Sequence, residues 1–450
     1  MDFLKETLLR KEDLINDTQK LLRINSVYDE KTVSDDAPFG KGVKESLDFM
    51  LDLAKEDGFE TFNCDNYSCH IEYGEGEEII GVLCHLDVVP VSGEWIYPPF
   101  SATRTNDRIY ARGAIDDKGP LMASYYALKI LKENNVKLNR RVRLILGCDE
   151  ETGVAGINRY FAAAEMPTLG FSPDADFPVI HGEKGMQGFV LKGKTKKSPL
   201  LSLKAGERFN IVPDLATMTL DIDLEKEFRQ YLDEHSYQGD VVGNVYTIKG
   251  KSAHAMQPHK GINAVTLLVD FLIKHIDDEL VNYLDKYITH SNFGEKYQIN
   301  DSDELMGNLT MNLGICNYEN NEFFLGIDIR YPNERDVDVI KKNVSESLGS
   351  FEVQFSPTNH VHYIDPNNDL VKTLMTSYQK YTNDYENKPF TIGGGTYART
   401  LKNGVAFGPL MVGREDVVHQ KNEYILIDDL VTSTAIYCDA IYRLGVKNEN

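Results

Sequence analysis

The chain has 450 residues, more than one hydrophobic core usually accommodates, so we expect two or three domains. With 42% hydrophobic and 26% charged residues, its composition is that of an ordinary globular protein. The net charge of -22 argues against a nucleic-acid partner, which usually needs a basic face. No stretch approaches the about 18 apolar residues of a membrane span, so we expect no membrane partner.

The N-terminal segment, Met1–Ile15, has leucines at the spacing of an amphipathic helix. It lacks the uninterrupted apolar region and the cleavage site of a signal peptide. Two of the six cysteines, Cys84 and Cys148, end expected buried strands, where reduced thiols act as small apolar side chains. Together these features predict a cytoplasmic protein.

Helix and strand patterns alternate in the first part of the chain. Val43–Lys55 and Gly156–Ala163 have apolar residues near helical spacing, and a proline opens a third expected helix over Leu121–Lys132. Ile79–Cys84 and Arg141–Gly147 are short apolar runs of the kind expected for strands buried on both faces. This alternation predicts an α/β fold with a mostly parallel sheet covered on both faces.

The pattern changes at about Gly188, where strands with one polar face begin, and this second pattern extends to about His362. It predicts an α+β domain built on an antiparallel sheet. Helical spacing resumes at Leu370–Tyr381. The expected strands of this part are Thr217–Asp223, Val245–Lys249, Met311–Cys316, Phe323–Ile329 and Phe351–Phe355, and its expected helices include Asn263–His275 and Asp336–Leu348.

Five short segments place carboxylates or a histidine where strands are expected to end. They are His85-Leu86-Asp87, Asp116-Asp117-Lys118-Gly119, Asp149-Glu150-Glu151, Pro173-Asp174 and His419-Gln420-Lys421-Asn422-Glu423. In open α/β sheets, ligands bind outside the carboxyl ends of the strands, so these groups could meet in one crevice. Two imidazoles, several carboxylates and no cysteine suit a pair of divalent metal ions. The pattern is typical of a two-metal hydrolase.

Each segment alone also has an ordinary structural explanation. A histidine such as His85 in a turn is more often structural, and Asp116 with Asp117 could simply cap the following helix. The acidic run Asp149–Glu151 could be an exposed turn. Adjacent carboxylates repel each other, however, and bound metal ions would relieve that repulsion. The metal hypothesis therefore depends on the five segments taken together.

The ordered set of segments resembles the carnosinase–aminoacylase–desuccinylase family of co-catalytic metallopeptidases, and the resemblance spans essentially the whole chain. Three further segments, Gly182–Gly185, Ala253–Met256 and Gly393–Arg399, make the chain most similar to the PepV-like bacterial dipeptidases. The resemblance implies a di-metal exopeptidase-like catalytic domain formed by residues 1–187 and 363–450. Residues 188–362 would form an inserted lid domain.

The resemblance also implies a role for each residue that matches a family motif. One ion would be bound by His85 and Asp174, the other by Glu151 and His419, with Asp116 bridging both ions and Asp117 structural. Zn²⁺ or Mn²⁺ would suit these ligands. Glu150 would be the general base on a water that bridges the ions, and Asp87 would orient the His85 ring.

Further matches concern the substrate. His254 would stabilise the oxyanion, Asn210 would contact the substrate, and Arg330 would clamp its C-terminal carboxylate. The backbone of Gly394 and Gly395, with Thr396, would also bind substrate. The alternatives are an ordinary turn histidine, an arginine paired with Asp328, and a bare glycine turn.

The function that follows is hydrolysis of small unblocked dipeptides. An N-acyl-amino-acid deacylase would use the same metal chemistry, and a catalytically silent metal-binding scaffold is an alternative from another class. The presence of Glu150 beside the ligands argues against the scaffold. Because the inserted segment is long enough to hold two subdomains, we expect His254 to act within its own chain and the protein to be a monomer. Hinges are expected near Gly185–Gly188 and His362–Pro366.

Overall fold

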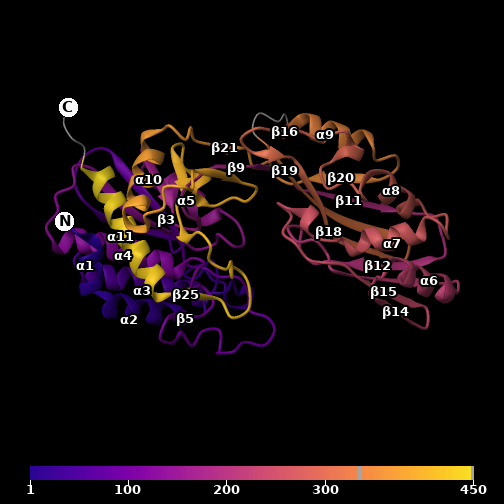
Figure 1. Cartoon of the computed structure of the whole chain (residues 1–450), viewed down its shortest axis with the longest axis horizontal. Helices are drawn as coiled ribbons and strands as arrows, with labels where there is room; N and C mark the ends of the chain where they lie inside the picture. Colours follow the sequence, from indigo (N-terminus) through magenta and orange to yellow (C-terminus); the bar gives the residue numbers. More distant parts are fainter. Residues whose placement is uncertain (333–336, 447–450) are drawn as a thin grey trace. The chain divides into compact units, whose positions relative to one another are not determined.

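The computed structural model describes residues 1–332 and 337–446 (Figure 1). Internal contacts divide the chain into a first unit, comprising Met1–His181, Ile364–Phe390 and Gly395–Asn450, and a second unit, comprising Gly182–Tyr363 and Thr391–Gly394. The expected domain limits placed residues 182–187 and 391–394 with the first part of the chain. The contacts place both stretches, and Tyr363, in the second unit. For residues 182–187 the reason is that Gly185 and Met186 pair with the end of a long strand of that unit.

The first unit is built on a sheet whose central strands are parallel and whose outer strands are antiparallel. Its order is β1 (Glu60–Cys64), β2 (Ser68–Tyr73), β6 (Arg141–Gly147), β3 (Ile79–His85), β7 (Leu169–Ser172), β23 (Gly404–Ala406), β9 (Ile180–Glu183) and β21 (His362–Tyr363), with β22 (Phe390–Ile392) beside β9. At this last edge of the sheet the chain passes between the units, and the end of β9, all of β21 and most of β22 are counted with the second unit. The chain leaves the first unit along β9 and returns along β21. The carboxyl ends of β6, β3 and β7, three adjacent parallel strands, therefore lie at one edge of the sheet.

Side chains that alternate along the central strands pack against helices on opposite faces of the sheet. Ile80 and Val82 of β3 belong to the large core formed with most of the helices, whereas Leu83 packs with Ile157 and Tyr160 in a smaller core. Helices α4 and α11 lie side by side on the face of the sheet that borders the large core (Figure 1). The helices of the large core are α1 (Phe3–Leu9), α2 (Lys11–Leu22), α3 (Lys41–Glu56), α4 (Lys118–Glu133), α10 (Asp369–Thr382) and α11 (Ile427–Gly445), and the smaller core contains α5 (Ala155–Ala163).

The amphipathic N-terminal segment is two helices where one was expected. At Arg10 the backbone leaves the helical conformation (φ -110°, ψ 10°), so α1 ends and α2 begins. The Arg10 guanidinium pairs with Glu6 and, far along the chain, with Glu133 of α4. The break lets each short helix turn its own apolar side chains, such as Phe3, into the large core.

The second unit is an antiparallel sheet with helices packed against one face. Its strand order is β14 (Gly239–Val242), β15 (Val245–Lys249), β13 (Leu215–Leu220), β12 (Leu200–Ala205), β18 (Thr310–Glu319), β19 (Glu322–Tyr331), β11 (Phe189–Lys194) and β20 (Glu352–Phe355), with β10 (Gly185–Met186) beside β19. Buried side chains of these strands form one core with α6 (Glu225–His235), α7 (Ala264–Leu272), α8 (Glu279–Tyr287) and α9 (Val337–Glu346). The helix expected from Asp336 begins at Val337 among the described residues, and Asp336 itself lies outside them.

Short elements connect and edge these layers. They are the strand pairs β8 (Ala175–Asp176) with β24 (Pro409–Leu410) and β16 (Ser302–Asp303) with β17 (Gly307–Asn308), the three-stranded sheet β4 (Thr103–Arg104), β5 (Arg108–Tyr110) and β25 (Tyr424–Leu426), and the 3-10 turns η1 (Glu30–Thr32), η2 (Pro258–Lys260), η3 (Glu295–Tyr297) and η4 (Tyr397–Thr400). Pairing of β25 with β5 brings the region after His419 beside the region before Asp116.

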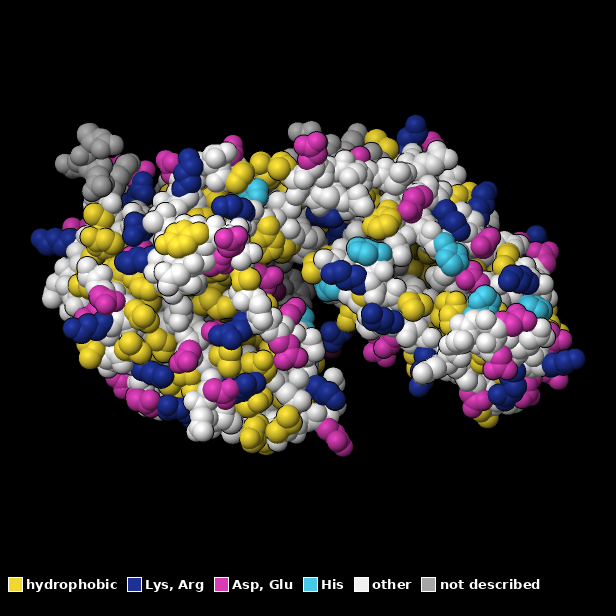
Figure 2. All heavy atoms as spheres, in the orientation of Figure 1, with side chains coloured by type: hydrophobic (Ala, Val, Ile, Leu, Met, Phe, Trp, Pro, Cys, Tyr) yellow, Lys and Arg dark blue, Asp and Glu magenta, His cyan; other side chains and the backbone are white. Residues whose placement is uncertain are grey.

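The charged residues that make up 26% of the chain are seen on its surface (Figure 2). Acidic and basic side chains are interspersed over the face drawn in Figure 2. Across the described part of the chain, no helix has both the length and the apolar character needed to cross a bilayer.

Candidate metal centre

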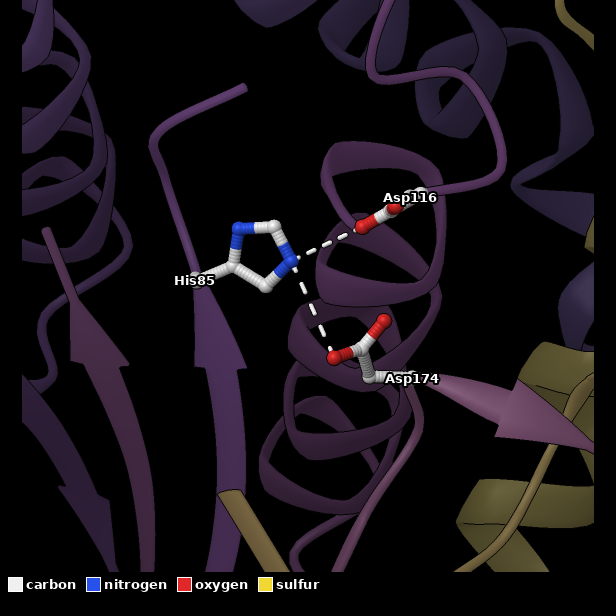
Figure 3. A group of neighbouring side chains, drawn as sticks. All are labelled: His85, Asp116 and Asp174. Carbon is white, nitrogen blue, oxygen red and sulfur yellow. Dashed lines mark hydrogen bonds and ion pairs between the residues drawn. The ribbon is translucent and has the colours of Figure 1, made fainter. Parts of the chain in front are cut away.

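The first candidate ligand group forms at the carboxyl edge of the parallel strands. His85 is the last residue of β3, Asp174 follows β7 by two residues, and Asp116 lies in the turn before α4. The Nε2 atom of His85 is 2.9 Å from Oδ1 of Asp116 and 3.8 Å from Oδ2 of Asp174 (Figure 3). Both carboxylates therefore point at the same ring nitrogen, which is the arrangement of a set of ligands around a shared centre.

The second group uses the other oxygen of the same aspartate. His419 Nε2 lies 2.9 Å from Oδ2 of Asp116 and 3.1 Å from Oε1 of Glu151. In each group, one donor atom from every residue lies within 4.8 Å of the others. Asp116 thus faces one imidazole with each carboxylate oxygen, and this is the geometry required of a bridging ligand.

The chemistry of these five side chains fits divalent metal ions. Burial raises the pKa of Asp174 to about 6 and that of Glu151 to about 7, and in both cases the charge of Asp116 adds to the rise. Burial alone would lower the pKa of His85, but hydrogen bonds to Asp116, Asp174 and Asp87 outweigh it and raise the pKa well above its usual value. Carboxylates crowded together in a buried place, with two imidazole nitrogens, form a donor set that bound cations would stabilise.

Asp117 has a different role from its neighbour. It occupies the N-cap position of α4 but its side chain makes no capping bond. Instead its fully buried Oδ2 accepts a hydrogen bond from the backbone N–H of His85, at 3.0 Å. Burial and the charge of Asp174 raise the pKa of Asp117 well above its usual value. Asp117 therefore fixes the main chain of a candidate ligand.

Glu150 and Asp87 lie together beside the ligand groups. The two carboxylate oxygens of Asp87 accept hydrogen bonds from the backbone N–H groups of Glu150 and Glu151, each at 3.0 Å. It is the backbone carbonyl of Asp87 that bonds Nδ1 of His85, at 2.9 Å, whereas its carboxylate is 3.5 Å from that atom. Asp87 thus contacts the His85 ring through its backbone carbonyl, and its carboxylate holds the acidic loop, which the sequence did not indicate.

The expected substrate residues of the second unit lie on adjoining segments. The backbone N–H of Ala255 donates to the carbonyl of Asn210 at 2.8 Å, which sets Asn210 beside His254. Nδ1 of His254 accepts a hydrogen bond from the Met256 N–H at 3.1 Å. The buried side chain of Asn312 donates to the carbonyls on both sides of Asn210, at 2.9 and 3.0 Å. No sequence signal distinguished Asn312 as the residue that fixes this segment.

Arg330 and the glycine run meet in the same unit. Arg330 Nη1 donates to the Gly393 carbonyl at 3.1 Å, directly before Gly394. Its Nε and Nη2 bind the two oxygens of Asp328 at 2.7 and 2.9 Å, which is the ion pair named as the alternative in the sequence analysis. That pairing fixes the orientation of the guanidinium. Among the other expected substrate residues, Gly395 and Thr396 belong to the first unit, where Thr396 caps η4 by accepting from the Ala398 N–H.

The bridging geometry predicts how metal binding responds to substitution. Asp116→Ala should lower the occupancy of both ions together, because one carboxylate faces both groups. The matched control is Asp117→Asn, whose amide oxygen can still accept from the His85 N–H and which should bind two ions. Metal content after dialysis, measured by atomic emission, distinguishes the two variants. Two tightly bound ions in folded Asp116→Ala protein would contradict the bridging assignment.

Comparison with known proteins places the whole chain in a family. Residues 81–443 match the model of Peptidase family M20/M25/M40. The chain is 45% identical over 464 residues to "Putative dipeptidase YtjP" of Bacillus subtilis, covering 99% of this chain and 100% of that protein. It is 41% identical to "Putative dipeptidase SAUSA300_1697" of Staphylococcus aureus, covering 98% and 99% of the two chains.

Solved structures share the fold. Human carnosine dipeptidase 1 has a TM-score of 0.59 at 13% identity and is covered to 99%, as is this chain. An M20 family metallo-carboxypeptidase from Sulfolobus solfataricus has a TM-score of 0.60 at 19% identity, covering 95% of this chain and 98% of that one. The match over most of the chain, the full-length relatives and the shared fold lead to one conclusion: this chain belongs to peptidase family M20/M25/M40.

Proposed function

We propose that this member of the M20 peptidases is a metal-dependent dipeptidase that hydrolyses small unblocked dipeptides. The observation that carries the proposal is the carboxylate of Asp116, shared between two ligand groups, with the non-ligand carboxyl of Glu150 beside them. Full-length relatives that bear the name dipeptidase support this substrate class over N-acyl amino acids. A scaffold without activity does not accord with membership of a peptidase family.

The residues that would hold the metal ions come from both groups. His85 and Asp174 would bind one ion, Glu151 and His419 the other, and Asp116 both. Imidazole and carboxylate ligands accept Zn²⁺ or Mn²⁺. When bound, a pair of such ions lowers the pKa of water and polarises the carbonyl of the scissile bond.

We assign the proton transfer to Glu150. Burial, then the neighbouring charges of Asp174 and Glu151, raise the pKa of Glu150 well above its usual value. Raised pKa values are common among carboxyl groups that act as proton acceptors and donors in active sites. The hydrogen bonds from its N–H and that of Glu151 to Asp87 fix the backbone of this loop. Glu150 would take a proton from the attacking water and give it to the nitrogen of the leaving amino acid.

Residues of the second unit would bind and orient the dipeptide. Because Nδ1 of His254 accepts a hydrogen bond, the neutral ring carries its proton on Nε2, where it can be donated to a developing oxyanion. Arg330, oriented by Asp328, would bind the C-terminal carboxylate, with Asn210 and the backbone of Gly394 in contact with the substrate. In the first unit, Gly395 and Thr396 would complete the contacts.

Two further properties belong to the proposal. All six cysteines are buried free thiols, which accords with a reducing compartment, and we place the protein in the cytoplasm. The second unit contains its own sheet and helical layer, which supports an inserted lid domain. We also propose that the protein acts as a monomer, with His254 serving its own chain.

The function is tested by adding Mn²⁺ or Zn²⁺ back to metal-free protein and measuring hydrolysis of a panel. Unblocked dipeptides should be cleaved. Their free carboxylate would bind Arg330 as the carboxylate of an N-acetyl amino acid would, so the free amine is the group whose effect the panel measures. N-acetyl amino acids form the matched comparison. Faster cleavage of N-acetyl amino acids would indicate a deacylase, and no cleavage of either class in protein that binds metal would refute both activities.

The role of Glu150 is tested against that of its neighbour. Glu150→Gln should keep both ions and lose at least about 100-fold in kcat, since a positioned proton acceptor typically contributes that much. Glu151→Gln should instead lose metal, because its carboxylate faces His419. Metal content and steady-state kinetics of the two variants are the measurements. The reverse pattern would exchange the two assignments.

The monomer is tested by mixing two inactive variants. His254→Ala should lower kcat by about 100-fold or more through loss of the oxyanion donor, with little change in metal content. Mixed with Glu150→Gln protein it should stay inactive if each chain uses its own histidine. Substantial recovery of activity in the mixture would show that the histidine is supplied by a second subunit.

A further inference from the structure

A buried ion pair lies directly behind the second ligand group, and the proposed chemistry does not use it. Glu423, the last residue of the fifth sequence segment, has no exposed surface, and Arg112 is 3% exposed. Arg112 Nη1 donates to Oε2 of Glu423 at 2.5 Å. The two residues are 311 positions apart in the sequence and come together because β25 pairs with β5. A buried pair of this kind contributes little net stability, because the cost of desolvating both charges can exceed their attraction.

The carboxylate of Glu423 reaches the main chain of the bridging residue. Its Oε1 accepts hydrogen bonds from the backbone N–H groups of Ile115, at 3.0 Å, and Asp116, at 3.3 Å. The backbone carbonyl of Glu423 also accepts from the Ala111 N–H at 3.1 Å. These contacts fix the turn from which the Asp116 side chain extends toward both imidazoles.

The guanidinium of Arg112 reaches the main chain of the other ligand. Its Nη2 donates to the carbonyl of His419 at 3.3 Å. The backbone of His419 has φ 61°, a left-handed conformation that is strained for a non-glycine residue. Such a conformation persists only where surrounding contacts hold it. On its outer side, the guanidinium lies 5.3 Å from the ring of Trp95, the one tryptophan of the chain.

We propose that Arg112 and Glu423 are positioning residues. They hold the main chains of Asp116 and His419 at the relative position required by the metal ion that these two ligands would share. This inference rests on the proposed metal assignment. One planar guanidinium and one carboxylate link two main-chain segments that carry ligands and are otherwise far apart in the sequence. Contacts behind the ligands typically contribute 10–100-fold to metal affinity.

Two variants separate the halves of the pair. In Glu423→Gln the amide oxygen can still accept from the Ile115 and Asp116 N–H groups, but an amide NH₂ then faces Arg112, and the guanidinium loses its buried partner. In Arg112→Lys the charge opposite Glu423 is kept, but a single ammonium cannot replace a planar fork that also binds the His419 carbonyl. The second variant therefore keeps the ion pair and removes the link to His419.

The measurement is calorimetric titration of metal-free protein with Zn²⁺, with near-UV circular dichroism to establish that each variant is folded. We expect at least one of the two ions to bind about 10–100-fold more weakly in both variants. The matched control is Asp439→Asn. Asp439 is also buried and pairs with Lys380 and Arg443, but these residues contact no candidate ligand in the described structure. This control should lower the denaturation midpoint and leave Zn²⁺ affinity unchanged.

The outcomes decide between positioning and general stability. Wild-type affinity for both ions in folded Glu423→Gln and Arg112→Lys would overturn the proposal, and so would an equal loss of affinity in Asp439→Asn. If Glu423→Gln does not fold, Arg112→Lys decides, and failure of both to fold would assign the pair to folding alone. Because the readout is Zn²⁺ binding, wild-type protein that binds two ions but cleaves no dipeptide would refute the proposed function without refuting this inference.

Discussion

The shared carboxylate of Asp116 is the constraint on which the rest of the first unit depends. Its two oxygens lie 2.9 Å from His85 Nε2 and 2.9 Å from His419 Nε2, so two imidazoles from opposite ends of the chain must meet at one side chain. His85 is supplied by a strand buried in the sheet and cannot move without disturbing the core. His419 is supplied by a loop, with its side chain 42% exposed, and must be brought to the strand edge by other contacts. The strand that carries His85 is held by the core, whereas the loop that carries His419 must be held by contacts of its own.

Crowding of acidic groups is the second consequence of this arrangement. Asp116 and Asp117 are buried beside Glu150 and Asp174, which are half-buried, and the Asp87 carboxylate lies next to them. The main chain supplies some of the compensating hydrogen bonds. Asp117 accepts from His85, and Asp87 accepts from both residues of the acidic loop. Backbone N–H groups are suited to this task because they stabilise negative charge without occupying the space that ligands need. The repulsion between these carboxylates is thus partly offset by hydrogen bonds from the main chain at the ends of the strands.

Much of the fold follows from the sequence because it is determined locally. The strand expected at Arg141–Gly147 has those bounds in the structure, and the run Ile79–Cys84 extends by one residue to His85. The α/β fold and the family are confirmed, whereas the roles of individual site residues stay predictions. The break at Arg10 could not be foreseen, since the packing of the two short helices and the pairing of Arg10 with Glu133 involve a helix that is distant in the sequence. The ion pair of Glu423 and Arg112 could not be foreseen either. Glu423 is part of the fifth sequence segment, but Arg112 is recognised as its partner only once β25 pairs with β5.

The burial of the cysteines has a practical consequence. All six are buried, and burial raises the pKa of every one of these thiols, so they react slowly and compete poorly for soft metals. The native thiols should therefore react little with a thiol-specific label. A cysteine introduced at an exposed position on each unit would carry a spin label or dye with little competition from native thiols. The separation of the two units in solution, with and without dipeptide, then becomes a distance that can be measured directly.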